Sequence, residues 1–350
     1  MAQRILVLPH IGTSLGHIIR LGSYLETRPH GEAHYIASIP RQHLASAARF
    51  LPDFVEILPR DNNFAVNNPT GRLDTDLFSR AIDYDLRLFS TIKPDLLVGD
   101  PGVRTGIIGV LTRCDWEALM HGCYLDLPAR LREEAGEKGR LFKLATLAWR
   151  LIDDYLNQLV AVGTKGRVSS WRLIRRTGKI VIPNSFDNEP LMDEKHFTEL
   201  PPAKGMEKGR PYKFVLTLCT GNKNLPPSKL LSALARRYEE VAVVGAASGP
   251  HIEGVHYLGD KYELGSLVDE NTVVLCHGGH GTLRTVVGKA KRIFAVPGDL
   301  DQVCNSIIGA IYSDVKLPPP RYFEVKLNSS TPFTREIDWS LVDARQLTDD

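Results

Sequence analysis

The chain has 350 residues, and its 43 basic and 41 acidic side chains leave a formal net charge of +2 at pH 7. A nearly neutral chain gives no electrostatic reason to expect nucleic acid as a partner, and this length excludes a single small binding module. We therefore expect two domains and a small-molecule partner.

The cysteines and the apolar runs bear on location. Five cysteines are present: Cys114, Cys123, Cys219, Cys276 and Cys304. Their spacing fits neither a metal site nor a disulfide framework, which favours a reducing, cytoplasmic location. The N-terminal run Ile5–Leu8 is too short for a signal peptide, and no apolar stretch reaches the length of a transmembrane helix. These features leave the oligomeric state open.

The first half alternates short apolar runs with helical periodicity. The expected strands are Ile5–Leu8, Ala33–Ile36, Phe54–Leu58 and Asp95–Val98, and the expected helices are Leu15–Leu25 and Leu77–Leu88. This alternation is typical of a parallel sheet covered by helices.

A long helix is predicted over 141–160, where apolar side chains recur on one stripe. Basic residues follow it at Arg167, Arg172, Arg175 and Arg176. We interpret the segment as a core-packing helix with a solvated basic end. A surface for a membrane or an anionic partner is the alternative.

The second half repeats the alternation after a break. Periodicity fails between Pro183 and Pro211, which indicates a linker. Beyond it, strands are expected at Phe214–Leu218, Val241–Val244, Thr272–Cys276 and Arg292–Val296, and helices at Lys229–Tyr238 and Thr282–Lys289. We predict an α/β protein of two Rossmann-like parallel-sheet domains, 1–195 and 213–325, facing each other across a cleft and joined by the linker 196–212. The final segment, 326–350, is expected to fold back over the first domain by analogy with similar architectures.

A glycine-rich loop follows the strand Thr272–Cys276. The chain there reads His277-Gly278-Gly279-His280-Gly281-Thr282 and continues as a helical pattern. Glycines let a ligand approach the backbone, and the start of a helix offers free N–H groups to a diphosphate. The loop is neither a Walker loop nor a G-x-G-x-x-G motif, and a tight structural turn is the alternative interpretation.

Asp301 and Gln302 follow the next predicted strand. Their carboxylate and amide can bond neighbouring hydroxyls, which favours a sugar ligand. An Asp-Gln pair in this place also commonly caps a helix.

The segment that begins at His277, HGGHGTLRTVVGKAKRIFAVPGDLDQVCNS, resembles a known donor-site signature. It is similar to that of the glycosyltransferase superfamily with the GT-B fold, which includes UDP-glucuronosyltransferases, plant glucosyltransferases and bacterial macrolide and antibiotic glycosyltransferases. The shared features are His-Gly-Gly-x-Gly-Thr, a helix, a strand ending in Pro, then Asp-Gln and an Asn. A weaker likeness covers Phe214–Gly221 and Ile5–Leu25.

The resemblance implies that 213–325 binds a nucleotide-sugar donor and that 1–195 binds the acceptor. The implied diphosphate contacts are His277, Gly278, Gly279, Gly281, Thr282 and Thr220, and the implied donor-sugar contacts are Asp301 and Gln302. Thr285 stands where members with ribose contacts carry Glu, and Cys219 stands where many carry Gly. Because a hydroxyl cannot accept both ribose hydroxyls as a carboxylate does, the donor nucleotide stays open.

His17 and Asp100 complete the predicted chemistry. His17 ends the stretch Gly12–His17 and resembles the Gly-His of the family's acceptor domain, whose histidine is the usual base. Asp100 ends the segment Lys93–Asp100, which matches Pro-Asp-x-x-x-x-Asp, where the second Asp partners that histidine. A carboxylate that orients an imidazole supports general-base chemistry. A helix-entrance residue and a helix cap are the alternative interpretations of this pair.

The residues around this pair carry less information. Many members have a proline shortly after the histidine, where this chain has Arg20, which we expect to be a solvated helix residue rather than to face the cleft. His10 and His121 also follow predicted strands, without assigned chemistry. No carboxylate cluster suggests a metal, so no metal or other cofactor is expected, and the helix dipole with His277 and Thr220 would stabilise the leaving diphosphate.

These residues predict an inverting glycosyltransferase. It would move a hexose-like sugar from a nucleoside diphosphate such as UDP or dTDP to a hydroxyl, less readily an amine, of a small natural-product acceptor, with antibiotic biosynthesis as the suggested context. A sugar-nucleotide epimerase or hydrolase on the same fold is one alternative. A non-catalytic glycosyltransferase-like partner protein is the other; Thr285 and Cys219 favour it, whereas His17, Asp100 and the Asp301-Gln302 pair oppose it.

Overall fold

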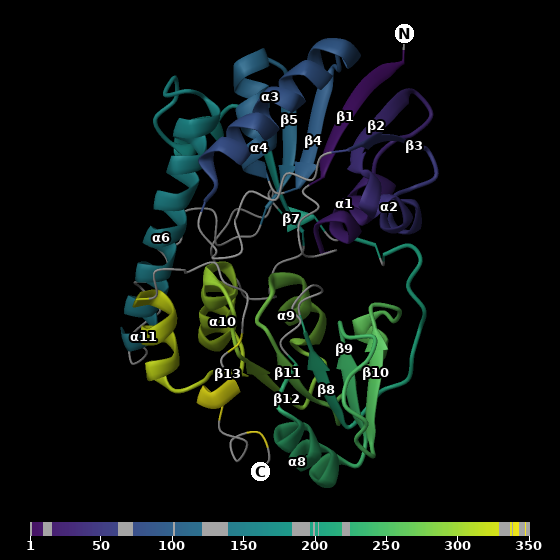
Figure 1. Ribbon diagram of the computed structural model, residues 1–350, viewed down its shortest axis with the longest axis vertical. Coiled ribbons are helices and arrows are strands. Elements are labelled where there is room, and N and C mark those ends of the chain that lie inside the picture. Colours follow the sequence, from purple (N-terminus) through teal and green to yellow (C-terminus); the bar gives the residue numbers. More distant parts are fainter. Residues whose placement is uncertain are drawn as a thin grey trace. The chain divides into compact units, whose positions relative to one another are not determined.

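The computed structural model describes residues 2–9, 16–61, 73–100, 102–120, 139–183, 197–198, 200–201, 203–218, 225–328, 337, 339–342 and 347. The chain divides into two compact units, Met1–Leu125 with Leu151–Ser185 and Met192–Gly205, and Asp126–Arg150 with Phe186–Leu191 and Met206–Asp350. Each unit has a parallel sheet with helices packed on it (Figure 1). The predicted α/β fold with two Rossmann-like sheets is confirmed.

The first unit is built on a parallel sheet. Among the described residues its order is β3-β2-β1-β4-β5-β6-β7. The strands are β1 (Gln3–Pro9), β2 (Ala33–Pro40), β3 (Val55–Arg60), β4 (Leu96–Asp100), β5 (Asp115–Leu119), β6 (Lys179–Pro183) and β7 (Phe197–Thr198). The helices are α1 (Gly16–Glu26), α2 (Leu44–Phe50), α3 (Thr75–Ile92), α4 (Gly102–Thr112), α6 (Gly139–Gly163) and α7 (Trp171–Ile174).

Local sequence explains the central elements of this unit. The residues of β1 from Ile5 to Pro9 are all buried, as expected for a parallel strand covered on both faces. Helix α3 begins where the Asp74 side chain accepts a hydrogen bond from the Leu77 N–H at 2.8 Å. It ends at Lys93, which has a left-handed φ of 50° and precedes a proline.

The strand order creates a switch point between β1 and β4. From β1 the chain proceeds to β2 on one side, whereas β4 leads to β5 on the other. The last residues of the two strands, Pro9 and Asp100, are paired in register. In open parallel sheets the carboxyl ends at such a point are where ligands bind.

The second unit has a similar sheet. Its order in the described residues is β10-β9-β8-β11-β12-β13. The strands are β8 (Phe214–Thr217), β9 (Val241–Val244), β10 (Val255–Gly259), β11 (Val273–Cys276), β12 (Arg292–Ala295) and β13 (Val315–Lys316), and the helices are α8 (Ser228–Tyr238), α9 (His280–Val286), α10 (Leu300–Tyr312) and α11 (Pro320–Asn328). The switch point lies between β8 and β11.

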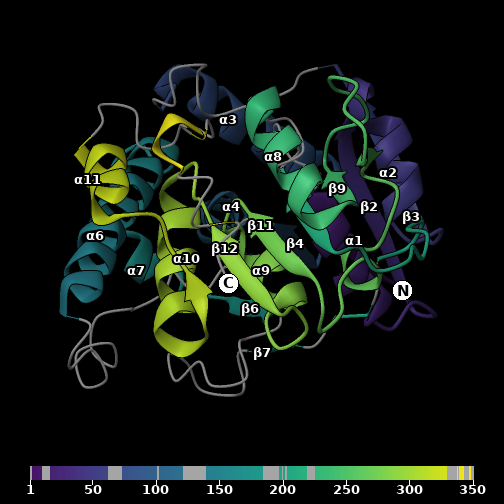
Figure 2. The same cartoon turned by 90° about the horizontal axis from the view of Figure 1, so that it is seen from below.

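Helices cover both faces of the second sheet. Figure 2 shows α8 on one face and α9 and α10 on the other, as right-handed crossovers that run in opposite directions from the switch point require. Under α8, the core contains Phe214, Leu216 and Leu234, which are buried.

Described residues near the C-terminus pack against this same core. Ile337, Trp339 and Leu347 belong to it, and the Tyr238 hydroxyl donates to the Leu347 carbonyl at 2.7 Å. These residues group with the second unit, and the expected return of 326–350 to the first domain stays a prediction.

Helix α6 is divided between the units. Its residues up to Arg150 group with the second unit and those from Leu151 with the first. The domain boundaries drawn from sequence, at 195 and 212, place the whole helix in the first domain and stay a prediction. Within the described part of the chain, no helix is long and apolar enough to cross a bilayer.

Candidate active site

The first cluster of predicted site residues lies at the switch point of the first sheet. His17 is the second residue of α1, and Asp100 is the last residue of β4. His17 Nδ1 lies 2.7 Å from Asp100 Oδ1, although the two residues are 83 positions apart. Sequence reasoning predicted this contact, and the structure has it.

The contact fixes the tautomer of the imidazole. A carboxylate only accepts hydrogen bonds, so Nδ1 carries the proton and donates it to Asp100. Nε2 then keeps its lone pair, which is the atom a general base uses. The side chain of His17 is 17% exposed while that of Asp100 is fully buried, so the imidazole is the member of the pair that solvent and ligands can reach.

Arg20 also binds Asp100, which corrects the expectation of a solvated residue. Its Nε donates to Oδ2 at 2.6 Å and its Nη2 donates to Oδ1 at 2.5 Å. The Arg20 side chain is 13% exposed. One turn of α1 therefore carries both His17 and the guanidinium of Arg20, which binds the same carboxylate.

Charge explains why Asp100 remains ionised in this setting. Burial alone would raise the pKa of Asp100, but the charges of Arg20 and His17 and their hydrogen bonds hold it below its ordinary value. The site therefore contains a carboxylate that is ionised, enclosed and bonded through both oxygens.

The second cluster is the glycine-rich loop after β11. His277 is 8% exposed, and its Nδ1 lies 3.5 Å from the Thr217 carbonyl at the end of β8. Gly278 has a φ of 73°, and a Cβ there would lie 2.0 Å from Ser306 Oγ. Only glycine allows this combination of left-handed backbone and close approach of α10.

Helix α9 begins two residues before the predicted start at Thr282. Gly279 is its N-cap, and His280 is its first residue. Gly281 is exposed and a Cβ on it would meet no atom within 4 Å, whereas Thr282 is half-buried. The N–H groups of Gly281 and Thr282 thus belong to the first turn, where helical N–H groups lack backbone partners.

Thr285 does not supply the acceptor groups of a carboxylate. Its hydroxyl donates to the Gly281 carbonyl at 2.8 Å, a bond that returns to the helix's own backbone. The position can offer a ligand only the lone pairs of one oxygen.

The Asp-Gln pair lies in the first turn of α10. Asp299 caps this helix by accepting from the Gln302 N–H at 3.1 Å. Gln302 is 4% exposed, and its Oε1 accepts from the Gly298 N–H at 2.8 Å. Asp301 is half-buried. The amide oxygen of Gln302 therefore bonds the loop after β12. Asp299 caps the helix, a role that the alternative interpretation gave to the Asp301-Gln302 pair.

The chain is similar to known proteins in structure but not detectably in sequence. No family model matches the sequence, and no curated protein matches it. Solved structures do match over the whole chain. SsfS6, a glycosyltransferase of Streptomyces sp. SF2575, has a TM-score of 0.56 at 14% identity, over 99% of this chain and 94% of that one. The chain has the GT-B fold.

Two further neighbours with this fold were solved with ligands. The rhamnosyltransferase SpnG, complexed with thymidine diphosphate, has a TM-score of 0.53 at 14% identity and covers 99% of this chain and 95% of that one. UGT89C1 of Arabidopsis thaliana, complexed with quercetin, has a TM-score of 0.56 at 12% identity, over 99% of this chain and 88% of that one. At these identities the likeness establishes the GT-B fold, and the chemistry depends on this chain's own residues.

Several residues considered from sequence lie outside the described part of the chain. They are Thr220, Cys219, His10 and His121. Among the described residues, no three His, Cys, Asp or Glu side chains gather where they could hold a metal ion.

Sequence reasoning missed the contacts of several enclosed polar side chains. Arg20 has its partner 80 positions away, so no local pattern reveals the pair. Thr217 Oγ1, Asn305 Nδ2 and Ser306 Oγ are buried and have no hydrogen-bond partner among the described residues. The only sequence signal for them was the Asn at the end of the resembled signature.

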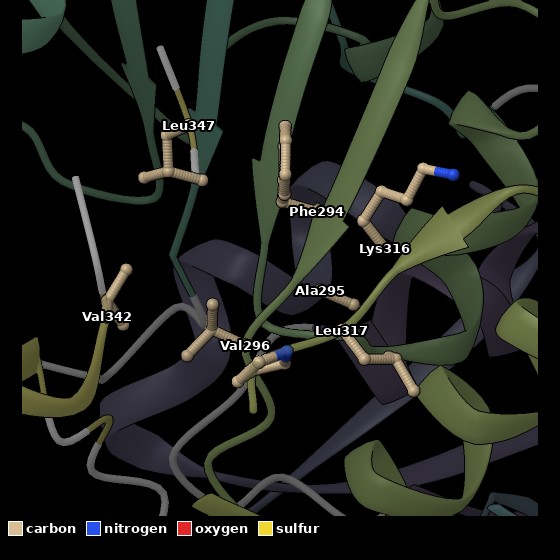
Figure 3. Close-up of a pocket in the computed structure, with 8 residues that line it drawn as sticks. Phe294, Ala295, Val296, Lys316, Leu317, Val342 and Leu347 are labelled. Atoms are coloured by element: carbon tan, nitrogen blue, oxygen red, sulfur yellow. The ribbon is translucent and has the colours of Figure 1, made fainter. Parts of the chain in front are cut away.

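A small apolar pocket lies elsewhere in the second unit (Figure 3). Residues at the ends of β12 and β13 line it together with Val342 and Leu347. None of the predicted site residues that the structure describes belongs to it. The pocket lies where C-terminal residues cover the sheet, and Lys316 is the one charged group among its described lining residues.

Proposed function

We propose that the chain is an inverting glycosyltransferase. It moves a hexose-like sugar from a nucleoside-diphosphate sugar to a hydroxyl, less readily an amine, of a small natural-product acceptor. The contact that carries this proposal is the one between His17 Nδ1 and Asp100 Oδ1 at 2.7 Å. It supports the assignment of His17 as an oriented base at the carboxyl edge of the first sheet, where parallel sheets commonly bind ligands.

The GT-B fold supports the same reaction class. Neighbours include the spinosyn rhamnosyltransferase SpnG with thymidine diphosphate and UGT89C1 of Arabidopsis thaliana with quercetin or UDP. A nucleoside diphosphate as leaving group and a small hydroxylated acceptor are therefore the first ligands to test.

The reaction balances with this chain's own groups. His17 Nε2 takes the proton of the acceptor hydroxyl as its oxygen attacks the anomeric carbon from the face opposite the diphosphate. The bond between that carbon and the phosphate oxygen breaks, and the nucleoside diphosphate leaves with the electron pair. Asp100 stabilises the imidazolium that forms. Attack from the opposite face inverts the anomeric configuration.

The glycine-rich loop is proposed to hold the diphosphate. His277, the backbone of Gly278 and Gly279, and the N–H groups of Gly281 and Thr282 would surround it, with Thr220 from the loop after β8. The open space above Gly281 supports this assignment. Asp301 would contact the donor sugar. Gln302 would contact the sugar as well, while its amide oxygen accepts from the Gly298 N–H.

Turnover with defined probes tests the proposal. UDP-glucose and dTDP-glucose are each incubated with quercetin, and products are identified by mass spectrometry and by the anomeric coupling in proton NMR. The expected result is a β-glucoside from an α-linked donor. Release of nucleotide without a glucoside would instead support a hydrolase or epimerase.

Substitution of the base provides the control. His17→Ala should lower kcat on the order of 10²–10⁴-fold while nucleotide binding persists. His34→Ala is the matched variant, since His34 also pairs with a carboxylate, Glu56 at 2.8 Å, away from the site. Equal activity of wild type and His17→Ala would refute the assignment of the base.

A further inference from the structure

The guanidinium of Arg20 and the carboxylate of Asp100 form a two-point contact. Nε meets one carboxylate oxygen and Nη2 meets the other, at 2.6 and 2.5 Å. Two parallel bonds between planar groups fix their relative orientation, which a single bond does not do. The plane of the Asp100 carboxylate is thus set by α1.

The same contact determines which carboxylate oxygen of Asp100 lies against His17 Nδ1. Asp100 Oδ1 receives both Arg20 Nη2 and His17 Nδ1, and these two nitrogens lie 3.2 Å apart. If the carboxylate rotated, Oδ1 would leave the imidazole and the preference for a protonated Nδ1 would weaken. Orientation of Asp100 and the tautomer of His17 are therefore coupled.

We propose that Arg20 is a positioning residue of the active site, which holds Asp100 so that His17 keeps its proton on Nδ1 and can accept the proton of the acceptor at Nε2. This role rests on the proposed transferase function. Arg20 touches neither substrate in the proposal and acts through Asp100.

The position of Arg20 in α1 supports the role. His17 and Arg20 are three residues apart, so they share a face of the helix. A proline, which many sequences with the resembled Gly-His have nearby, has no side-chain donor and could not make this contact. In this chain one helix turn supplies both the base and the group that orients its carboxylate.

A purely structural role for Arg20 is the competing explanation, and Arg28 provides the matched control. Arg28 follows the same helix, its side chain is 20% exposed, and its Nη1 pairs with Glu117 Oε2 at 2.9 Å. Arg20→Gln and Arg28→Gln each remove one partly buried ion pair near α1. Only the first removes a contact with the residue that orients His17.

The first measurement needs no substrate. Proton NMR detects the Nδ1 proton of a histidine that donates to a carboxylate as a strongly downfield line, assigned here by its loss in His17→Asn. We expect that line in the wild type and in Arg28→Gln, and its loss or displacement in Arg20→Gln. An unchanged line in Arg20→Gln would overturn the proposal whatever the chain catalyses.

The second measurement uses turnover of UDP-glucose or dTDP-glucose with quercetin. Arg20→Gln should lower kcat by about 10–100-fold, the usual cost of removing an outer partner of an active-site group, with the KM for donor unchanged. Arg20→Lys keeps one donor and should recover part of the loss. Arg28→Gln should retain wild-type kcat. An equal loss in Arg20→Gln and Arg28→Gln, or a loss confined to KM, would contradict a positioning role.

Discussion

Two glycines of one loop should respond in opposite ways to the same change. Gly278→Ala places a methyl group at a φ of 73°, which costs about 1–2 kcal/mol for a residue with Cβ. That methyl also lies 2.0 Å from Ser306 Oγ, and overpacking of this kind costs about 1–3 kcal/mol. The two effects together predict a loss of about 2–5 kcal/mol in the free energy of unfolding.

Gly281→Ala should cost no stability. A Cβ at this position meets no atom within 4 Å, and the residue is part of α9. Alanine is favoured over glycine within a helix by roughly 0.5–1 kcal/mol. If the open space receives the diphosphate, however, the methyl should weaken UDP or dTDP binding on the order of tenfold, or about 1.4 kcal/mol.

Urea unfolding and nucleotide titration measure both effects. A second variant isolates the steric part, because Ser306→Ala removes a hydroxyl that has no partner among the described residues. Gly278→Ala with Ser306→Ala should recover most of the overpacking cost and keep the backbone cost, a coupling that a double-mutant cycle reveals. Equal destabilisation by Gly278→Ala and Gly281→Ala would refute the reasoning from backbone geometry.

Three further outcomes follow from the described contacts. Asp100→Asn should lower the free energy of unfolding by about 3–5 kcal/mol near neutral pH, because it leaves the Arg20 charge without its carboxylate. The pKa of Asp100 in the folded protein is held below its ordinary value of 3.8, so the stability advantage of the wild type is full above pH 3.8 and is lost as the pH falls through the lower, folded pKa. Acid unfolding of both proteins measures this difference. Thr285→Glu restores a carboxylate where the resembled signature has one, and it should tighten UDP binding on the order of tenfold by calorimetry; unchanged affinity would contradict a ribose contact there. Asp74→Ala removes the bond to the Leu77 N–H and should cost about 0.5–2 kcal/mol in thermal unfolding without changing nucleotide affinity.

Strands buried on both faces were readable from the sequence. β9 has the predicted bounds Val241–Val244, and β1, β8 and β11 differ from prediction by a few residues at their ends. Each is a continuous apolar run, which a parallel sheet requires and few other environments do. The order of these strands in each sheet, and hence the two switch points, was not predicted and comes from the structure.

Strands stabilised by distant partners were not readable. β5 contains Glu117, a polar residue in a short run, and its carboxylate accepts from the Tyr24 hydroxyl at 2.6 Å and pairs with Arg28. The edge strand β10 is only half-buried and lacks a clear apolar pattern. Periodicity reports burial along the local chain, so an element whose polar groups are satisfied from elsewhere escapes it.

The candidate site divides in the same way. The contact between His17 and Asp100 was predicted from the resemblance of their two segments to a known family, and the structure has it. Arg20 and the bond from the Gly298 N–H to Gln302 were missed, because a solvated arginine and a ligand-binding glutamine have the same local sequence as residues that bond within the fold. The assignments of ligand roles to the loop residues stay predictions.

The division of α6 limits how the chain can be recombined. Residues up to Arg150 group with the second unit, where Arg140 Nη2 pairs with Glu324 Oε1 of α11 at 2.8 Å. A chimera that exchanges only the chain beyond residue 206 for a homologous half would separate this part of α6 from the surface on which it packs. An exchange that keeps these contacts intact must therefore transfer the first half of α6 together with the C-terminal half, as two segments of one gene.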